Sequence, residues 1–229
     1  MRAKTFAWLA HLYTATGLLC AAAIAILIVH GGDASFRLAF MLMAAATVID
    51  ATDGWLARRA RVKDVLPRFD GRRLDDLVDF QTYTTLPLLL IWRADLLPGP
   101  AALVLVLALL ASAYGFSQSD AKTDDGFFLG FPSYWNVVAF YLYMLEPPPA
   151  IAAGLIVVLS VMTFVPTRYL YVTQGGPFAR PMIAGAVVWT VLIVGVLAAP
   201  ADRAYTLAVV SLIYPAAYLV LSAFVALRA

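Results

Sequence analysis

Long apolar runs, separated by short polar segments, make up most of this chain. Roughly 20 consecutive apolar residues are enough to carry a helix through the hydrocarbon core of a bilayer. The pattern therefore predicts about eight membrane-spanning helices. Their approximate bounds are residues 8–29, 35–58, 72–91, 100–117, 133–145, 151–169, 181–197 and 204–227. We expect an all-α, polytopic membrane protein with a single domain over residues 1–229.

Composition strengthens this prediction. Hydrophobic residues make up 63% of the 229 residues and charged residues only 13%. Soluble domains carry about a quarter charged residues, so an ordinary soluble enzyme is excluded. The single cysteine, Cys20, excludes an intrachain disulfide and a cysteine-based metal site. We expect no cleaved signal peptide, because the first apolar run is long enough to span and further spans follow it.

Basic residues predict the orientation of the chain. Cytoplasmic loops of membrane proteins carry an excess of Lys and Arg. With about eight spans and a cytoplasmic N-terminus, all of the 16 Lys and Arg residues except Arg37, Arg93 and Arg203 fall on the cytoplasmic side. We therefore expect both termini, and the basic loop after residue 58, in the cytoplasm.

Aspartates stand within or beside the apolar runs between residues 50 and 79, namely Asp50, Asp53, Asp75, Asp76 and Asp79. A carboxylate in hydrocarbon costs about 3 kcal/mol or more, so packing does not explain them. On helices, Asp50 and Asp53 lie about 60° apart, and Asp75 and Asp79 about 40° apart. Two neighbouring helices would then direct four oxygen donors to one point. Mg²⁺ and Mn²⁺ prefer such ligands and often retain substrate phosphates as well.

Glycines accompany these pairs, with Gly54 beside Asp53 and Gly71 ahead of Asp75. They remove side chains where a bulky ligand would approach the backbone. We interpret the stretch as a membrane-embedded metal site for a phosphate-bearing substrate, with Asp76 as a supporting residue. The alternative is a patch of solvated acids paired with nearby arginines, which leaves the spacing and the glycines unexplained.

The residues of this stretch resemble the signature of the CDP-alcohol phosphotransferase family. The matching positions are Asp50, Asp53, Gly54, Ala57, Arg58, Gly71, Asp75 and Asp79. Twelve residues separate Arg58 from Gly71, a longer spacer than is usual in the family. That departure resembles the bacterial phosphatidylcholine synthase branch. Further stretches resemble the same branch, namely DGRRLDDLVDFQTYT from Asp70, DAKTDDGFFLGFPSYWN from Asp120 and VPTRYLY from Val165.

The resemblance implies an enzyme that transfers substituted phosphate groups. In that branch a phosphatidyl group passes from CDP-diacylglycerol to choline, which gives phosphatidylcholine and CMP. One or two Mn²⁺ or Mg²⁺ ions would be held by Asp50, Asp53, Asp75 and Asp79. Asp79 would also be the general base. The residues implied to bind the CDP-lipid are Gly54, Ala57, Arg58, Gly71 and Lys122. Arg58 has a second interpretation, as an anchor at the cytoplasmic surface.

Choline carries a permanent cation that cannot donate a hydrogen bond, so its site would need aromatic faces and carboxylates. Tyr83 lies one helical turn after Asp79 and is the best-placed candidate. Further candidates are Tyr134, Trp135, Tyr169 and Asp76. The aromatic residues have an alternative interpretation as a belt at the membrane interface. His11 and His30 stand apart from the aspartates in sequence and are not predicted to join a site.

The same resemblance places the protein in the bacterial inner membrane, as a multi-pass protein with its active site at the cytoplasmic face. Its expected partners are CDP-diacylglycerol, choline and membrane lipid, and by family analogy a second copy in a homodimer. No nucleic-acid motif occurs in the chain.

Two alternatives remain open at the level of the sequence. The first keeps the chemistry but replaces choline with serine, inositol or glycerol phosphate. The second is a transporter coupled to a metal ion or to protons. Transporters usually place such carboxylates near the membrane midplane, between repeated halves. Here the aspartates lie at one predicted face, and no repeat is visible in the sequence.

Overall fold

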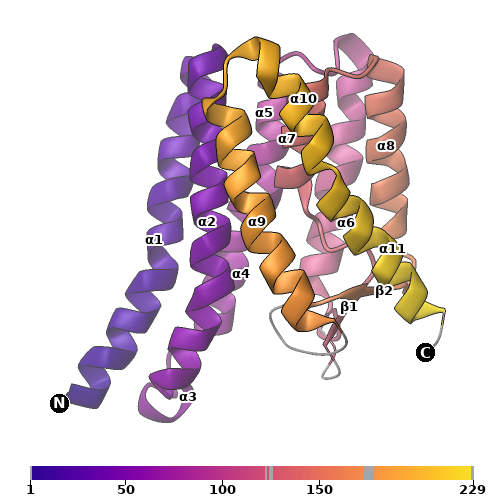
Figure 1. Cartoon of the computed structure of the whole chain (residues 1–229). Coiled ribbons are helices and arrows are strands. Elements are labelled where there is room, and N and C mark those ends of the chain that lie inside the picture. Colours follow the sequence, from indigo (N-terminus) through magenta and orange to yellow (C-terminus); the bar gives the residue numbers. More distant parts are fainter. Residues whose placement is uncertain (1, 122, 124–125, 173–177, 228–229) are drawn as a thin grey trace. The chain divides into compact units, whose positions relative to one another are not determined.

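Figure 1 shows a computed structural model of the chain, which describes residues 2–121, 123, 126–172 and 178–227. The described residues are mostly helical, and the expected all-α membrane fold is confirmed. Helices long and apolar enough to cross a membrane cover Arg2–His30, Asp33–Arg59, Gly99–Ser117, Ala179–Ala198 and Ala201–Ala226. The residues form two compact units, Met1–Pro87 and Leu88–Ala229, which are described separately.

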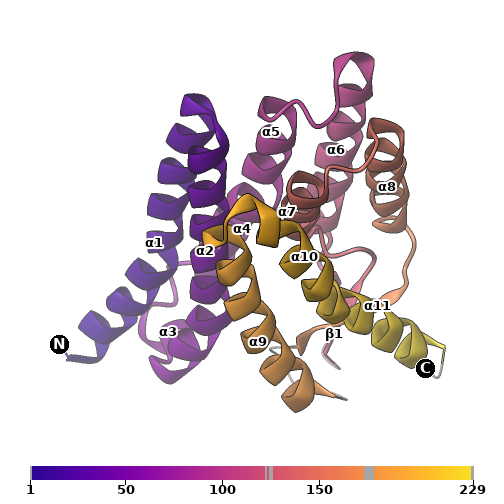
Figure 2. The same ribbon diagram turned by 45° about the horizontal axis from the view of Figure 1, so that its top comes forward.

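The first unit is built on two long helices. Its elements are α1 (Arg2–His30), α2 (Asp33–Arg59), α3 (Val62–Val65), α4 (Gly71–Asp79) and the π-helical turn η1 (Phe80–Thr85). Helix α5 (Leu86–Arg93) begins at its end. Helices α1 and α2 run side by side in both ribbon views (Figures 1 and 2). A tight turn joins them, in which Gly31 and Gly32 have positive φ angles that favour glycine.

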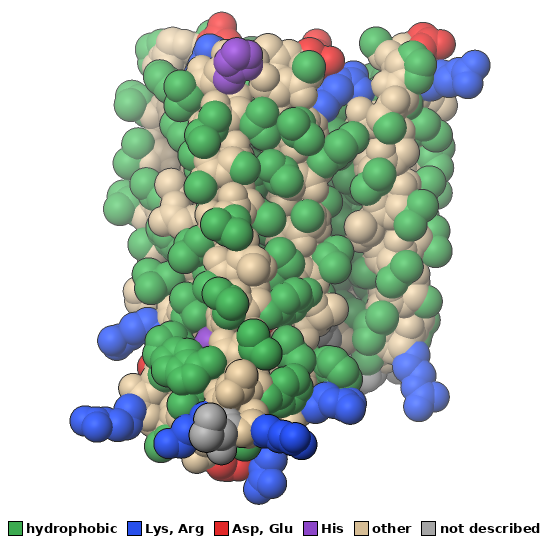
Figure 3. All heavy atoms as spheres, turned by 90° about the vertical axis from the view of Figure 1, so that its left-hand side faces the viewer, with side chains coloured by type: hydrophobic (Ala, Val, Ile, Leu, Met, Phe, Trp, Pro, Cys, Tyr) green, Lys and Arg blue, Asp and Glu red, His purple; other side chains and the backbone are tan. Residues whose placement is uncertain are grey.

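Helix α1 has an apolar surface as well as an apolar core. Its buried side includes Ala10, Ile24 and Ile28, whereas Leu19 and Ile26 are largely exposed. Figure 3 views the side of the molecule where α1 lies, and there hydrophobic side chains fill the middle while charged ones gather at the ends. Such an exposed surface suits contact with lipid chains, because lipid is as apolar as the side chains themselves.

Helical segments α4, η1 and α5 follow one another without a break. The chain begins α4 after Asp70, whose carboxylate accepts a hydrogen bond from the backbone amide of Arg73 at 3.1 Å. This is an N-cap, which satisfies one of the free amides at the helix start. The cap fixes where α4 begins, at Gly71, four residues before Asp75.

The second unit contains the remaining elements, which are η2 (Gly99–Leu103), α6 (Val104–Ser117), β1 (Phe127–Leu129), α7 (Trp135–Leu145), α8 (Pro149–Met162), β2 (Arg168–Leu170), α9 (Ala179–Ala198), α10 (Ala201–Ser211) and α11 (Ile213–Ala226). Helix α6 packs on α8, and α9 packs on α10. Strand β2 lies against α11, where the Tyr218 hydroxyl donates to the Leu170 carbonyl at 3.1 Å.

One boundary of the predicted spans in this unit is wrong. The sixth span was predicted to reach residue 169, but α8 ends at Met162. Pro166 follows a few residues later, and proline cannot continue a helix. Strand β2 occupies residues 168–170 instead and pairs antiparallel with β1. The last predicted span agrees with the stretch Ala201–Ala226, within which a turn at Leu212 separates α10 from α11 shortly before Pro215.

Candidate metal centre

Carboxylates from two helices of the first unit meet at one point. Asp50 comes from α2, and Asp75 and Asp79 come from α4. One oxygen from each of the three lies within 4.8 Å of the others. Three like charges this close repel one another strongly in a low-dielectric setting, and a bound cation relieves that repulsion. An all-oxygen donor set of this kind fits a hard divalent cation. Aspartates from the two predicted helical pairs therefore form a cluster of three that could hold a metal ion.

Asp53 was predicted as a fourth ligand. It lies one turn after Asp50 on α2 and is buried, with 6% of its surface exposed. Burial of a carboxylate is energetically costly, so a structural or ligand-binding role is the expected reason for Asp53. It is not one of the three mutually close carboxylates found among the described residues, so its role as a ligand stays a prediction.

Tyr83 connects the turn after α4 to the cluster. Its hydroxyl donates a hydrogen bond of 2.7 Å to Oδ2 of Asp50. The residue lies in η1, a single π-helical turn directly after Asp79. Such turns are frequent at functional sites. The sequence singled out Tyr83 for its position one turn after Asp79, but the bond to Asp50 on the other helix was not predicted.

Helix α2 ends in the predicted CDP-lipid residues. Gly54, Ala57 and Arg58 occupy its last turns, and Arg58 is exposed. A methyl group at position 54 would lie 3.4 Å from Nη1 of Arg58, so the glycine leaves room for this guanidinium. Arg59 lies over the ring of Trp55, with its Cζ 5.4 Å from the ring centre. The end of α2 therefore presents cationic groups within two turns of Asp53.

Gly71 begins α4, four residues before Asp75. The space beside it is filled by a residue that sequence reasoning had set aside. A Cβ atom at position 71 would lie 2.6 Å from Cε1 of His11, which is on α1. No sequence signal links these two distant positions. Asp76, also on α4, is partly buried. Lys122, predicted to bind the CDP-lipid, lies outside the described residues.

The other choline candidates belong to the second unit. Trp135 is fully buried, and its Nε1 donates to Oγ of Ser112 at 2.7 Å. Tyr169 is buried in strand β2 among other apolar residues. Tyr134 is partly buried, with its ring centre 6.1 Å from that of Tyr218. Their proposed contact with choline stays a prediction.

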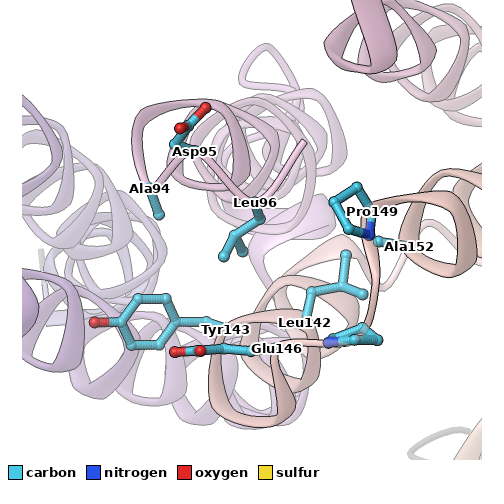
Figure 4. A pocket seen from close by; sticks show the side chains of 9 residues that line it. Ala94, Asp95, Leu96, Leu142, Tyr143, Glu146, Pro149 and Ala152 are labelled. Atoms are coloured by element: carbon cyan, nitrogen blue, oxygen red, sulfur yellow. The ribbon is translucent and has the colours of Figure 1, made fainter. Parts of the chain in front are cut away.

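The second unit also contains a pocket of about 320 Å³, shown in Figure 4. None of the predicted site residues lines it. Its polar lining comes from Tyr143, Glu146 and Asp95, and the Asp95 carboxylate points away from the opening in Figure 4. Both carboxylates are exposed, so each keeps its hydration without needing a ligand.

We compared the chain with protein-family models and with curated proteins. No protein-family model matches the chain. The phosphatidylcholine synthase of Legionella pneumophila is 38% identical over 167 residues, which are 72% of this chain and 64% of that protein. The phosphatidylcholine synthase of Legionella bozemanae is 42% identical over 58% of this chain and 62% of that protein. The match thus spans less than two thirds of both Legionella proteins.

The fold and the site together define a polytopic α-helical membrane protein with a carboxylate cluster that can hold a metal ion. The phosphatidylcholine synthase of Pseudomonas aeruginosa is 33% identical over 189 residues, which are 82% of this chain and 78% of that protein. The chain belongs to the phosphatidylcholine synthase family. The resemblance found in the aspartate signature is thereby confirmed.

Proposed function

We propose that the protein transfers the phosphatidyl group of CDP-diacylglycerol to choline, which yields phosphatidylcholine and CMP. The observation that carries this proposal is the convergence of Asp50, Asp75 and Asp79 from two helices. The similarity to phosphatidylcholine synthases supports the choice of reaction. The cluster supports the choice of mechanism, because transfer of a phosphoryl-type group depends mainly on alignment and charge neutralisation.

Asp50, Asp75 and Asp79 would hold one or two divalent ions, Mn²⁺ or Mg²⁺, with Asp53 as a further ligand. Their geometry fits such a group, since one oxygen from each of the three lies within 4.8 Å of the others. A bound ion would neutralise charge on the diphosphate and align it for attack. Tyr83 would orient Asp50 through its 2.7 Å hydrogen bond, as outer partners of metal ligands commonly do.

Asp79 would accept the proton of the choline hydroxyl. The choline oxygen attacks the phosphorus bonded to the diacylglycerol oxygen, and the bond from that phosphorus to the bridging oxygen breaks. CMP leaves with the bridging oxygen and its electron pair. Asp79 is the most buried of the three clustered aspartates, at 8% exposed, so its carboxylate is shielded from bulk water.

Gly54, Ala57 and Arg58 would bind the cytidine and phosphates of the donor. A guanidinium offers two parallel hydrogen bonds to phosphate oxygens, and Arg58 is exposed at the end of α2. The donor lipid would enter from the surrounding bilayer with its head group at this end of α2.

Choline would bind through its cation. The ring of Tyr83 and the partly buried carboxylate of Asp76 belong to the same helical stretch as Asp79. Tyr134, Trp135 and Tyr169 are further proposed contacts. Aromatic faces and carboxylates are the groups that attract a quaternary ammonium ion. We place the site at the cytoplasmic face of the bacterial inner membrane, where CMP can leave, and include a homodimer in the proposal.

The proposal is tested by CMP release from detergent-purified protein given CDP-diacylglycerol and Mn²⁺. Choline, serine, inositol and glycerol 3-phosphate are supplied in separate reactions, with a reaction lacking any alcohol as the control. We expect CMP release with choline and background release in the others.

Other outcomes contradict specific parts of the proposal. Release with another alcohol would retain the aspartate mechanism and refute choline as the acceptor. If no reaction released CMP and the protein were shown to be folded, the enzyme assignment would be contradicted. Uptake of Mn²⁺ or protons into proteoliposomes made from the same sample would then favour a transporter.

A further inference from the structure

Helix α1 contributes no aspartate to the cluster, yet it packs along the helix that carries two of them. The contact between α1 and α4 has a reciprocal form. At one point the His11 ring of α1 faces Gly71 of α4, and at another Val78 of α4 faces Gly17 of α1. At each point a bulky side chain on one helix meets the bare backbone of the other.

Both contacts are too close for a side chain at the glycine. A Cβ atom at Gly71 would lie 2.6 Å from Cε1 and 3.0 Å from Nδ1 of His11. A Cβ atom at Gly17 would lie 2.5 Å from Cγ1 of Val78. Packed interiors tolerate added atoms poorly, so either methyl group would displace the facing side chain or shift α4 against α1.

His11 acts here through its bulk. Its side chain is 5% exposed, and its Nε2 has no hydrogen-bond partner among the described residues. The ring instead packs against Phe69, 4.5 Å between ring centres, and against Trp8 at 6.0 Å. The imidazole is therefore held in a fixed position between these aromatic rings and the start of α4.

The two contacts lie close to Asp75 and Asp79 in the sequence of α4. Gly71 lies four residues before Asp75, and Val78 directly precedes Asp79. Any displacement of α4 from α1 therefore moves both carboxylates relative to Asp50. A misplacement of about 1 Å in a catalytic group can cost about 100-fold in rate.

We propose that His11 and Gly17 are positioning residues, which fix α4 so that Asp75 and Asp79 meet Asp50 at metal-binding distance. In this proposal Gly71 makes room for the His11 ring. The family resemblance instead implied that Gly71 makes room for the CDP-lipid. The inference rests on the proposed function only in assigning the bound ion a role in catalysis; the positioning of the aspartates does not depend on the reaction.

A double-substitution cycle at positions 11 and 71 separates the two roles of the glycine. Binding of Mn²⁺ alone, without substrates, is measured by electron paramagnetic resonance titration for Gly71→Ala, His11→Ala and the double variant. We expect Gly71→Ala to weaken Mn²⁺ binding about 10-fold or more, by analogy with the loss of other residues that support metal ligands. His11→Ala alone should itself weaken Mn²⁺ binding, because the ring that holds the start of α4 is lost. Adding it to Gly71→Ala should restore binding to the level of His11→Ala, because the removed ring leaves room for the methyl group.

The decisive comparison is between His11→Ala and the double variant, since it does not require Gly71→Ala alone to fold. Our proposal predicts Mn²⁺ affinities within about threefold of each other, as alanine is a better helix former than glycine once the clash is removed. A double variant that binds Mn²⁺ at least 10-fold more weakly than His11→Ala would overturn the proposal. So would a Gly71→Ala protein with normal Mn²⁺ binding but a raised KM for CDP-diacylglycerol.

The pair Gly17 and Val78 gives an independent test of the same packing. Gly17→Ala should weaken Mn²⁺ binding, and Val78→Ala in the same chain should restore it. Gly154→Ala is the matched control, because that glycine lies in α8 with nothing within 4 Å of the added atom. Loss of Mn²⁺ binding by the control, or no rescue by Val78→Ala, would contradict the proposal.

The same titration distinguishes this inference from the proposed reaction. A wild-type chain that binds no Mn²⁺ would overturn the positioning role, since there would be no metal site to position. A wild-type chain that binds Mn²⁺, shows the rescue pattern and releases no CMP would overturn the proposed reaction and leave the positioning role supported.

Discussion

The side chain of Asp79 has the most demanding role of any single residue in this account. It lies in the cluster of three aspartates that could hold a metal ion and is also proposed to accept a proton. Replacement by asparagine keeps an oxygen that can face a metal but removes the basic carboxylate. The two functions of the residue can therefore be separated by experiment.

We expect Asp79→Asn to lower the rate of CMP release by about 100-fold to 10,000-fold, the usual contribution of a general base. Mn²⁺ binding should weaken far less. Asp64→Asn is the matched control, because Asp64 is exposed and paired with Arg61 away from the cluster. Near-normal turnover by Asp79→Asn would refute the assignment of the base.

Asp75→Ala and Asp53→Ala remove an oxygen donor completely. We expect both variants to lose Mn²⁺ binding and, with it, the high-affinity binding of CDP-diacylglycerol, because the ion would bridge protein and diphosphate. Equilibrium binding of Mn²⁺ and of the CDP-lipid to each purified variant checks this. Undiminished Mn²⁺ binding by Asp53→Ala would confine the metal site to the three clustered aspartates.

Tyr83 offers a test of how the cluster is supported. Tyr83→Phe removes the hydroxyl that donates to Asp50 but retains the ring. We expect the Mn²⁺ concentration for half-maximal activity to rise about 10-fold or more, with the KM for choline unchanged. Tyr83→Leu should raise the choline KM as well, because the aromatic face is also lost. A Phe variant with normal Mn²⁺ dependence would show that the hydroxyl has no orienting role.

At the residue scale, sequence spacing identified the clustered aspartates but not their neighbours. Asp50, Asp75 and Asp79 are visible because charge in an apolar run is costly and their helical spacing is regular. The bond from Tyr83 to Asp50 and the contact of His11 with Gly71 join residues on different helices. Contacts of that kind depend on how the helices pack, and the packing of helices cannot be read from the pattern of a single sequence.

The start of α4 is the element on which the position of Asp75 depends most. Asp70 caps this helix through the amide of Arg73. We expect Asp70→Ala to destabilise the first turn by about 1 kcal/mol, the typical cost of losing an N-cap. Faster hydrogen exchange at residues 71–74 would report the loss. Unchanged exchange there, relative to Asp64→Ala, would contradict the capping role.

At the element scale, hydrophobic pattern predicted where helices exist better than how they end. Helix α2 matches its predicted span closely, whereas α1 begins at Arg2, ahead of the predicted start at residue 8. The early end of α8 and the pairing of β1 with β2 were missed. The residues from Arg168 to Leu170 are as apolar and aromatic as a helix end at the membrane interface, so length and composition did not separate the two conformations.

The whole molecule is expected to span the membrane with its N-terminus in the cytoplasm. This orientation rests on the distribution of the 16 Lys and Arg residues. In a Cys20→Ser background, we expect Lys63→Cys to react with a membrane-impermeant maleimide only in inside-out vesicles. Asp33→Cys should react only in right-side-out vesicles. The reverse labelling pattern would contradict the predicted orientation and place the aspartate cluster on the other face.

At the scale of the molecule, the sequence was sufficient for the fold class and the family but not for the acceptor site. The family follows from a motif with fixed spacing, and the similarity to phosphatidylcholine synthases extends over 82% of this chain. The residues that enclose choline depend on the packing of aromatic side chains from segments far apart in sequence, and aromatic residues also line any membrane interface. Their roles are therefore matters for experiment.

The most direct test of the central claim is the transfer itself, because CMP release alone would also follow from hydrolysis of the donor. Purified protein in proteoliposomes receives CDP-diacylglycerol, Mn²⁺ and labelled choline, and the label is measured in the lipid fraction. We predict labelled phosphatidylcholine from the wild type and from Asp64→Asn, and almost no labelled lipid from Asp79→Asn. Chelation of Mn²⁺ should abolish the labelled lipid, and re-addition of Mn²⁺ should restore it. Label that stays in the aqueous fraction while CMP is released would contradict the account, since it would show donor hydrolysis without transfer to choline.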